Sequence, residues 1–219
     1  CREGGVSFFS SGINPGFTAE ALPVAISAVA DRIDHIHCIE LVDMAHYTSG
    51  QIVHEAIGMG KPAETRTPLE NDGPVEENAY YTSALLMQDA FGLKFDEVVR
   101  STEKALARSD IQVPWGVIKQ GTIAGLRMRL QGMLGGKPCF TSDDVPDDWP
   151  TGDSTWLIRI EGDPEINCRF DMESKTGRTV SHVTSMAALN RVRDVIAAEP
   201  GVRTRLDFPL TAGGRIAAL

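Results

Sequence analysis

The stretch WLIRIEGDPEINCRFDM, residues 156–172, carries the clearest structural signal in the chain. One set of alternate positions is apolar, from Trp156 to Ile160 and again from Ile166 to Phe170, and most positions between them are polar or charged. Side chains of a strand point to opposite faces in turn, and the intervening Gly162-Asp163-Pro164 has the composition of a turn. The stretch therefore predicts an antiparallel hairpin with one apolar face.

Alternation also occurs before this hairpin and predicts further strands. In segment 33–44, Ile36 and Cys38 fall on one face, whereas His35 and His37 fall on the other. The expected strands outside the hairpin are 6–11, 33–44 and 117–130.

Other segments repeat their apolar residues at helical spacing. Gly92 is expected to end one helix and Asp96 to cap the next, so that the two form a helical hairpin. The last helix is expected to bury Leu189, Val192, Val195 and Ile196. The expected helices are 18–33, 49–57, 76–91, 96–107 and 185–198. These elements predict an α+β fold with a mixed, largely antiparallel sheet flanked by helices.

Composition restricts the class of protein. The 219 residues carry a formal net charge of -9 with scattered Lys and Arg, which argues against a nucleic-acid partner. No apolar run approaches the roughly 20 residues of a membrane span, so we expect no membrane partner. The four cysteines are widely spaced, which suits reduced thiols in a cytoplasm.

Gly12-Ile13-Asn14-Pro15-Gly16-Phe17 is the most informative short motif. Gly12 and Gly16 permit close approach of the backbone to a flat ligand, and the Asn14 amide can both donate and accept hydrogen bonds. Phe17 can form the wall of a pocket. Asn-Pro-Gly is also a common turn, so the residues alone leave both interpretations open.

Two other patterns imitate functional sites. Gly58-Met59-Gly60-Lys61-Pro62-Ala63 matches a dinucleotide fingerprint in form, but it follows an expected helix and indicates a glycine-rich helix end instead. His35 and His37 share a strand face while Cys38 points away, so only two metal ligands are expected to converge. We therefore expect no metal site.

The chain resembles the dihydrodipicolinate-reductase-like family that includes 2,4-diaminopentanoate dehydrogenase and the native amine dehydrogenases. The resemblance begins at Val6 to Pro23, which contains the Gly12 to Phe17 motif. It continues through Gly58-Met59-Gly60, the helix 76–91, the strand Gly121 to Leu126 and the tail Ala198 to Pro209.

The resemblance implies the C-terminal domain of a Rossmann-type two-domain dehydrogenase that acts on a C–N bond. Residues 1–17 would be the junction from a missing NAD- or NADP-binding domain, 18–210 the substrate-binding and dimerisation domain, and 211–219 a tail. Gly12, Asn14, Pro15, Gly16 and Phe17 would lie beside the nicotinamide. The sheet would line the amine or imine pocket and pair subunits into a homodimer, and the catalytic acid would belong to the missing half.

Substrate contacts are expected in the loops that follow strands, where ligands commonly bind. His46 and Tyr47, just after the segment 33–44, are candidates both for substrate binding and for proton transfer, and His54 is a further substrate-binding candidate.

Two alternatives remain open. Cys1 can be an N-terminal nucleophile of an amidohydrolase, with its own α-amine as the base. The chain can also be a non-catalytic module for assembly or ligand sensing.

Overall fold

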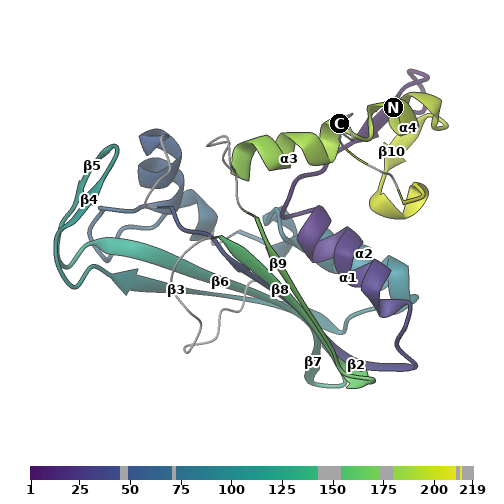
Figure 1. The fold of residues 1–219 in the computed structure, drawn as a ribbon, viewed down its shortest axis with the longest axis horizontal. Coiled ribbons are helices and arrows are strands. Elements are labelled where there is room, and N and C mark those ends of the chain that lie inside the picture. The colour runs from purple at the N-terminus through teal and green to yellow at the C-terminus, as the bar shows by residue number, and fades with distance from the viewer. Residues whose placement is uncertain (45–48, 71–72, 143–153, 173–179, 211–212, 214–219) are drawn as a thin grey trace, which may run out of the picture.

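The centre of the molecule is a six-stranded sheet, seen in Figure 1 with the helices on one side of it. The computed structural model describes residues 1–44, 49–70, 73–142, 154–172, 180–210 and 213. The strand order is β3-β6-β7-β2-β8-β9. The strands are β2 (Arg32–Leu41), β3 (Glu97–Leu106), β6 (Ile123–Leu134), β7 (Lys137–Ser142), β8 (Thr155–Asp163) and β9 (Ile166–Asp171).

Pairing in this sheet is antiparallel except between β2 and β7. The predicted hairpin is confirmed as β8 and β9, with Trp156 opposite Phe170 and Ile160 opposite Ile166. The expected strand 33–44 is β2, which pairs antiparallel with β8. The α+β fold with a mixed, largely antiparallel sheet is therefore confirmed.

The main core lies between the sheet and two helices, α1 (Leu22–Ser27) and α2 (Tyr81–Phe91). Strand residues Ile36, Ile158 and Ile160 are fully or almost fully buried there, together with Met87 of α2. Gly92 ends α2 in the left-handed conformation at φ 62°, as the sequence predicts.

The predicted helix 96–107 is wrong, because this segment is the edge strand β3. Burial along β3 alternates with a period of two, and the strand pairs with β6 from Glu97 opposite Met133 to Leu106 opposite Ile123. Asp96 does not cap a helix; its carboxylate accepts a hydrogen bond from the Gly135 backbone N–H at 2.7 Å. Long-range pairing with β6 thus overrides the helix-forming residues in the segment.

The first and last expected helices are also shorter than predicted. Segment 18–33 contains a π-helical turn, η1 (Phe17–Ala21), followed by α1, and β2 begins at Arg32. Segment 185–198 is divided between α3 (Val180–Leu189) and α4 (Val192–Ala197). Because the helix is interrupted, Leu189, Val192 and Ile196 are 58%, 46% and 78% exposed, contrary to the prediction that they are buried.

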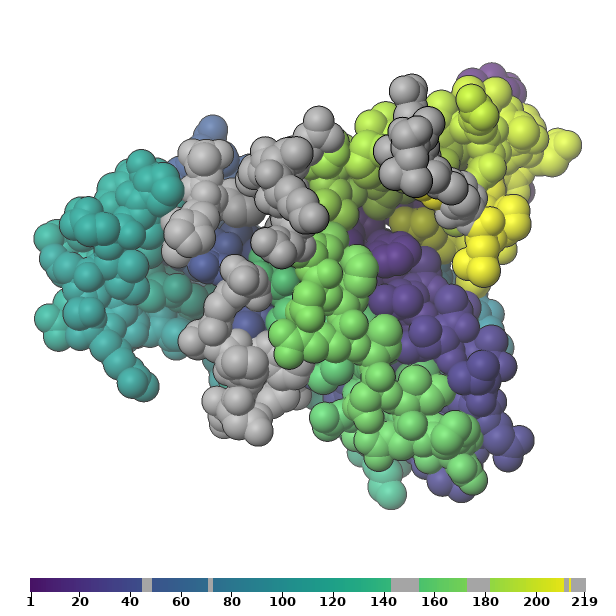
Figure 2. Space-filling view, in the orientation of Figure 1, coloured from purple at the N-terminus to yellow at the C-terminus, as the bar shows by residue number. Residues whose placement is uncertain are grey.

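A second, smaller sheet joins two segments that are far apart in the sequence. Strand β1 (Ser7–Phe9) pairs in parallel with β10 (Gly201–Arg203). In Figure 2 the purple N-terminal residues and the yellow-green residues after 180 gather in one lobe, away from the teal end of the main sheet. Strand β10 is followed by a short 3-10 turn, η5 (Arg205–Asp207).

The remaining elements form a minor core around Val53 and Ile118. They are η2 (Ile52–Ile57), the hairpin β4 (Ile111–Val113) and β5 (Gly116–Ile118), and the 3-10 turns η3 (Pro68–Glu70) and η4 (Val75–Glu77). The expected strand 117–130 is therefore two strands, β5 and β6, separated at Gly121 with φ 81°. Gly58 ends η2 at φ 87°, so the glycine-rich helix end is confirmed. Within the described residues, no helix has the length and apolar character needed to cross a membrane.

Candidate functional site

The loop Gly12 to Phe17 connects β1 to η1 and is held by its own backbone. Phe17 N–H donates to the Gly12 carbonyl at 2.9 Å, and Thr18 N–H donates to the Ile13 carbonyl at 2.8 Å. Gly16 has φ 133°, and a Cβ at this position would lie 2.5 Å from the Gly12 carbonyl oxygen. The glycine at 16 is therefore required by the closed shape of the loop itself.

A partly buried carboxylate, Glu40, lies against this loop. Asn14 Nδ2 donates to Glu40 Oε2 at 2.7 Å, and the indole N–H of Trp156 donates to Glu40 Oε1 at 2.6 Å. Three segments thus meet at one carboxyl group: the loop, β2 and β8. Burial raises the pKa of Glu40, and the hydrogen bonds from Asn14 and Trp156 oppose this rise.

Trp156, which donates to Glu40, belongs to a row of aromatic rings. The rings of Phe17 and Phe170 lie 5.8 Å apart, and those of Trp156 and Phe170 lie 5.9 Å apart. A carboxylate beside aromatic rings can receive a small organic cation, since both its charge and the ring faces attract positive charge.

Sequence reasoning missed Glu40, although a signal for it exists. Glu40 follows Ile36 and Cys38 at intervals of two, so it falls on the strand face that is otherwise apolar. An acidic residue on a core face needs partners or a function.

A cavity of about 400 Å³ has Phe17 of this loop in its lining. Its lining includes apolar Leu22 and Ala187 and the two guanidinium groups of Arg191 and Arg205. Burial, and then the positive charge of Arg191, lower the pKa of Arg205. Two arginines against an apolar wall can bind an anionic group.

The predicted substrate residues do not all fall within the described structure. His46 and Tyr47 lie outside the described residues. His54 belongs to η2, where its Nδ1 lies 2.8 Å from the Met59 carbonyl and its ring lies 6.3 Å from that of Trp115. His54 and Trp115 line an open pocket of about 580 Å³ between η2 and the β4–β5 hairpin, in a different part of the described chain from the loop 12–17.

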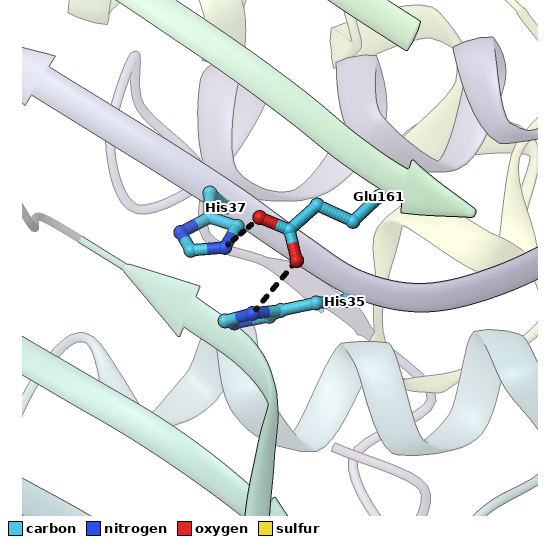
Figure 3. A group of neighbouring side chains, drawn as sticks. All are labelled: His35, His37 and Glu161. Carbon is cyan, nitrogen blue, oxygen red and sulfur yellow. Dashed lines mark ion pairs between the residues drawn. The ribbon is translucent and has the colours of Figure 1, made fainter. Parts of the chain in front are cut away.

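The opposite face of the main sheet carries a cluster that the sequence analysis did not anticipate. His35 and His37 share this face as predicted, but Glu161 of β8 joins them (Figure 3). Glu161 Oε1 lies 3.3 Å from His37 Nε2, and Oε2 lies 3.9 Å from His35 Nδ1. The expectation that only two possible ligands converge is therefore wrong, because the third comes from the neighbouring strand.

Comparisons with known proteins agree with this fold. An amine dehydrogenase of Streptomyces virginiae is 28% identical over 223 residues, covering 95% of this chain and 62% of that protein. A 2,4-diaminopentanoate dehydrogenase of Acetoanaerobium sticklandii is 26% identical over 217 residues, covering 95% of this chain and 59% of that protein. The chain thus spans about three-fifths of the length of these relatives.

A solved structure shows the same fold at lower sequence identity. The amine dehydrogenase of Mycobacterium smegmatis aligns with 100% of this chain and 62% of its own, with a TM-score of 0.68 and 17% identity. The sequence profile of the 2,4-diaminopentanoate dehydrogenase C-terminal domain matches residues 17–216. Because that match covers most of the chain, the chain belongs to the family of 2,4-diaminopentanoate dehydrogenase C-terminal domains.

Proposed function

We propose that this chain is the substrate-side part of an NAD(P)-dependent oxidoreductase that acts on the C–N bond of a small amine or imine. The family and the two curated relatives, an amine dehydrogenase and a 2,4-diaminopentanoate dehydrogenase, support this reaction class. The observation that carries the proposal in this structure is the Glu40 carboxyl, held by Asn14 and Trp156 beside the Gly12 to Phe17 loop.

Glu40 suits the charge of such a substrate. An amine is largely an ammonium ion at neutral pH, and the iminium that it forms on oxidation is also a cation. A carboxylate placed next to the nitrogen favours both, and it can accept the ammonium proton before oxidation. Asn14 and Trp156 present only N–H donors to Glu40, so they orient the carboxyl group and favour its charged form.

The loop Gly12 to Phe17 fits one wall of a nicotinamide site. From this loop the Asn14 amide contacts Glu40, and the Phe17 ring packs against Phe170. A bound nicotinamide would supply the hydride acceptor or donor. The chain's own contribution is to hold the substrate nitrogen at Glu40 and to surround it with the rings of Trp156 and Phe170, which exclude water.

His46 and Tyr47 remain candidates for substrate binding and proton transfer. Strand β2 ends at Leu41, one residue after Glu40, so the chain leaves the sheet beside this carboxyl group. His54 remains a substrate-binding candidate through its separate pocket with Trp115.

We also propose that an N-terminal nucleotide-binding domain packs on the lobe formed by β1, β10 and α4. Parallel sheets normally have both faces covered, yet Val6, Phe8 and Val202 are 56%, 54% and 70% exposed. The relatives are longer than this chain by enough residues to form such a domain. We place the junction at 1–17 and the substrate domain at 18–210, with 211–219 as a tail; β10 is the part of the substrate domain that pairs with β1 of the junction.

The sheet face opposite the helices is proposed to pair two copies of the chain in a homodimer. We place the contact on the strands within 117–130 and 155–173, where Arg159 and Arg169 are exposed on this face and Glu161 is left free of the contact. The four free cysteines suit a cytoplasmic protein. Sedimentation at micromolar concentration should show a dimer, and a monomer would contradict this pairing.

Activity of the complete protein tests the function. The natural open reading frame, expressed in full, should reduce NAD⁺ or NADP⁺ when given a small primary amine, and should oxidise the reduced cofactor with a ketone and ammonia. The 219-residue chain alone should bind neither cofactor tightly. Absence of turnover in both directions with both cofactors, across short-chain amines, amino acids and diamino acids, would refute the proposal.

A further inference from the structure

We propose that His35, His37 and Glu161 form a Zn²⁺ site that ties β2 to β8 on the sheet face opposite Glu40. Two imidazoles and one carboxylate are ligands that Zn²⁺ prefers, and three protein ligands leave a position for water. The site is separate from the proposed amine site, because the side chains at 35 and 37 and the side chain at 40 leave β2 on opposite faces.

The backbone register brings the three residues together. His35 pairs directly with Glu161 across the β2–β8 ladder, and His37 lies two residues further along the same face. The ring centroids of His35 and His37 lie 3.6 Å apart, and the Glu161 carboxyl group points towards both rings in Figure 3. Two neighbouring strands of a rigid sheet therefore supply all three groups.

The distances are close to those of a metal site. The three candidate ligand atoms all lie within 4.8 Å of one another. Ligands of a tetrahedral Zn²⁺ at 2.0–2.2 Å are separated by about 3.3–3.6 Å. His37 Nε2 and Glu161 Oε1 already have this separation, at 3.3 Å. Small side-chain rotations would bring His35 Nδ1, now 3.9 Å from Oε2, to the same separation.

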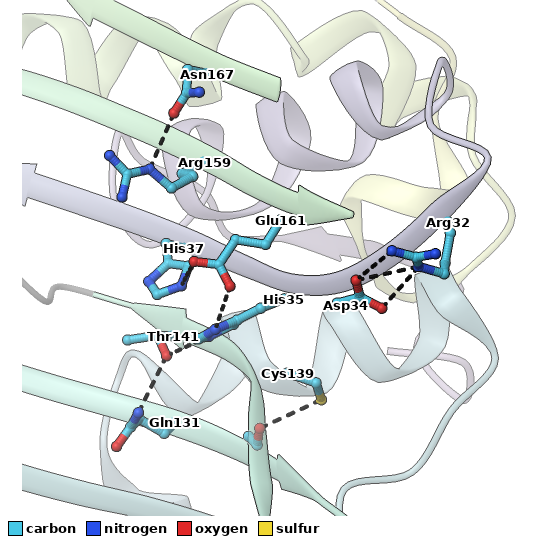
Figure 4. Close-up of polar contacts among 11 residues, drawn as sticks. Arg32, Asp34, His35, His37, Gln131, Cys139, Thr141, Arg159, Glu161 and Asn167 are labelled. Carbon is cyan, nitrogen blue, oxygen red and sulfur yellow. Dashed lines mark hydrogen bonds and ion pairs between the residues drawn. The ribbon is translucent and has the colours of Figure 1, made fainter. Parts of the chain in front are cut away.

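A neighbouring strand orients the first imidazole. His35 Nε2 lies 2.8 Å from Thr141 Oγ1 on β7, and Gln131 Nε2 of β6 donates to that hydroxyl oxygen at 3.4 Å (Figure 4). If Nε2 carries the proton and donates to Thr141, Nδ1 presents its lone pair towards Glu161. A hydrogen bond of this kind at the non-ligating nitrogen is the usual support of a metal-bound histidine.

The solvent exposure and the charge of the three side chains also suit a cation site. The side chains of His35, His37 and Glu161 are 11%, 22% and 47% exposed, so an ion can reach them from solvent. Two imidazolium rings at 3.6 Å would repel each other, whereas neutral rings can share one cation with the carboxylate. Arg159 lies opposite His37 in the ladder, but its guanidinium is directed to Asn167 Oδ1 at 3.1 Å. This positive charge weakens the site, and proton competition weakens it further as the pH falls.

The test uses Zn²⁺ with the 219-residue chain after chelator treatment. Calorimetry should show one ion per chain, and a saturating concentration near 100 times the dissociation constant should raise the melting temperature by about 5–10 °C. His37→Gln and Glu161→Gln should each lose the ion. His182→Gln, which removes an imidazole from α3 instead, should retain it.

Cobalt substitution provides a second measurement that does not depend on stability. Bound Co²⁺ should give the strong visible absorption of a four- or five-coordinate ion without a sulfur charge-transfer band, and Glu161→Gln should abolish it. Circular dichroism must show that each variant is folded. Absence of binding by the unmodified chain, or one ion retained in both His37→Gln and Glu161→Gln, would overturn the proposal. Neither outcome depends on turnover of amines.

Discussion

The charged groups on the two faces of strand β2 lie in different surroundings. On the helix-covered face, Glu40 is partly buried, accepts two N–H hydrogen bonds and lies beside aromatic rings. On the other face, His37 and Glu161 lie near solvent and near each other. One strand thus carries two kinds of chemistry on its opposite faces, because its side chains alternate. The surroundings on each face therefore determine what its charged groups can bind.

The largest expected effect is that of Glu40→Gln in the complete protein. If Glu40 lies beside the substrate nitrogen as proposed, loss of its negative charge should lower kcat/KM for amine oxidation by roughly 100-fold or more. The glutamine amide also places an N–H donor against the donor groups of Asn14 or Trp156, which can destabilise the fold. The folded fraction must therefore be measured in parallel. Glu165→Gln, at an exposed carboxylate in the β8–β9 turn, is the matched control. Equal turnover of the two variants would remove Glu40 from the amine site.

Gly16→Val should act mainly on stability. The backbone at 133° is strained for valine, and its Cβ would collide with the Gly12 carbonyl oxygen. We expect a loss of about 1–3 kcal/mol or more in the free energy of unfolding, measured by urea denaturation. Gly5→Val is a useful control, because Gly5 also has a positive φ, 63°, but has no atom within 4 Å of its Cβ position. Equal losses in both variants would show that the closed loop adds nothing to the requirement for glycine at 16.

A smaller effect should appear in the pH dependence of stability. The folded-state pKa of Glu40 is raised by burial, so folding favours its protonated form. Protonated Glu40 therefore stabilises the folded state below the ordinary pKa of 4.5. This contribution is lost as the pH rises through the higher pKa that Glu40 has in the folded state. Asn14→Ala removes one hydrogen-bond donor to the carboxylate, so the pKa of Glu40 should rise further. The free energy of unfolding should then fall more steeply with increasing pH. Urea denaturation from pH 4 to 8 should therefore give a steeper decline for Asn14→Ala than for the unmodified chain, and a parallel curve would contradict the assignment.

The smallest effect is expected on the exposed face of β9. Arg169 pairs with Asp171 at 2.8 Å, and the two side chains are 57% and 55% exposed. Solvent screens such a pair, so Arg169→Gln should leave turnover of the complete protein and the melting temperature unchanged. A large loss of turnover would mean that the two faces of the sheet are not functionally separate.

The sequence predicts those parts of the fold that depend on local information. The β8–β9 hairpin has its turn and its alternation within one short stretch, and the end of α2 depends on Gly92 alone. Strand β3 could not be recognised in this way, because Glu, Lys, Ala and Leu are common in helices and the partner strand β6 begins only at Ile123. Its strand state depends on that distant partner.

The candidate sites follow the same rule. The loop Gly12 to Phe17 could be selected from its residues, because its shape is encoded in consecutive positions. Glu40 obtains its partners from Asn14 and Trp156, and the histidine pair obtains Glu161 from another strand. Neither group of residues can be recognised before the strand pairing is known. The position of Glu40 on an otherwise apolar strand face was the one signal in the sequence.

The parallel pairing of β1 and β10 has a mechanical consequence. Two chain segments, rather than a single linker, connect the small lobe to the main sheet, and the pair is held side by side from Ser7 opposite Gly201 to Phe9 opposite Arg203. If a nucleotide-binding domain packs there as proposed, the paired strands β1 and β10 would restrict its rotation relative to the sheet that carries Glu40.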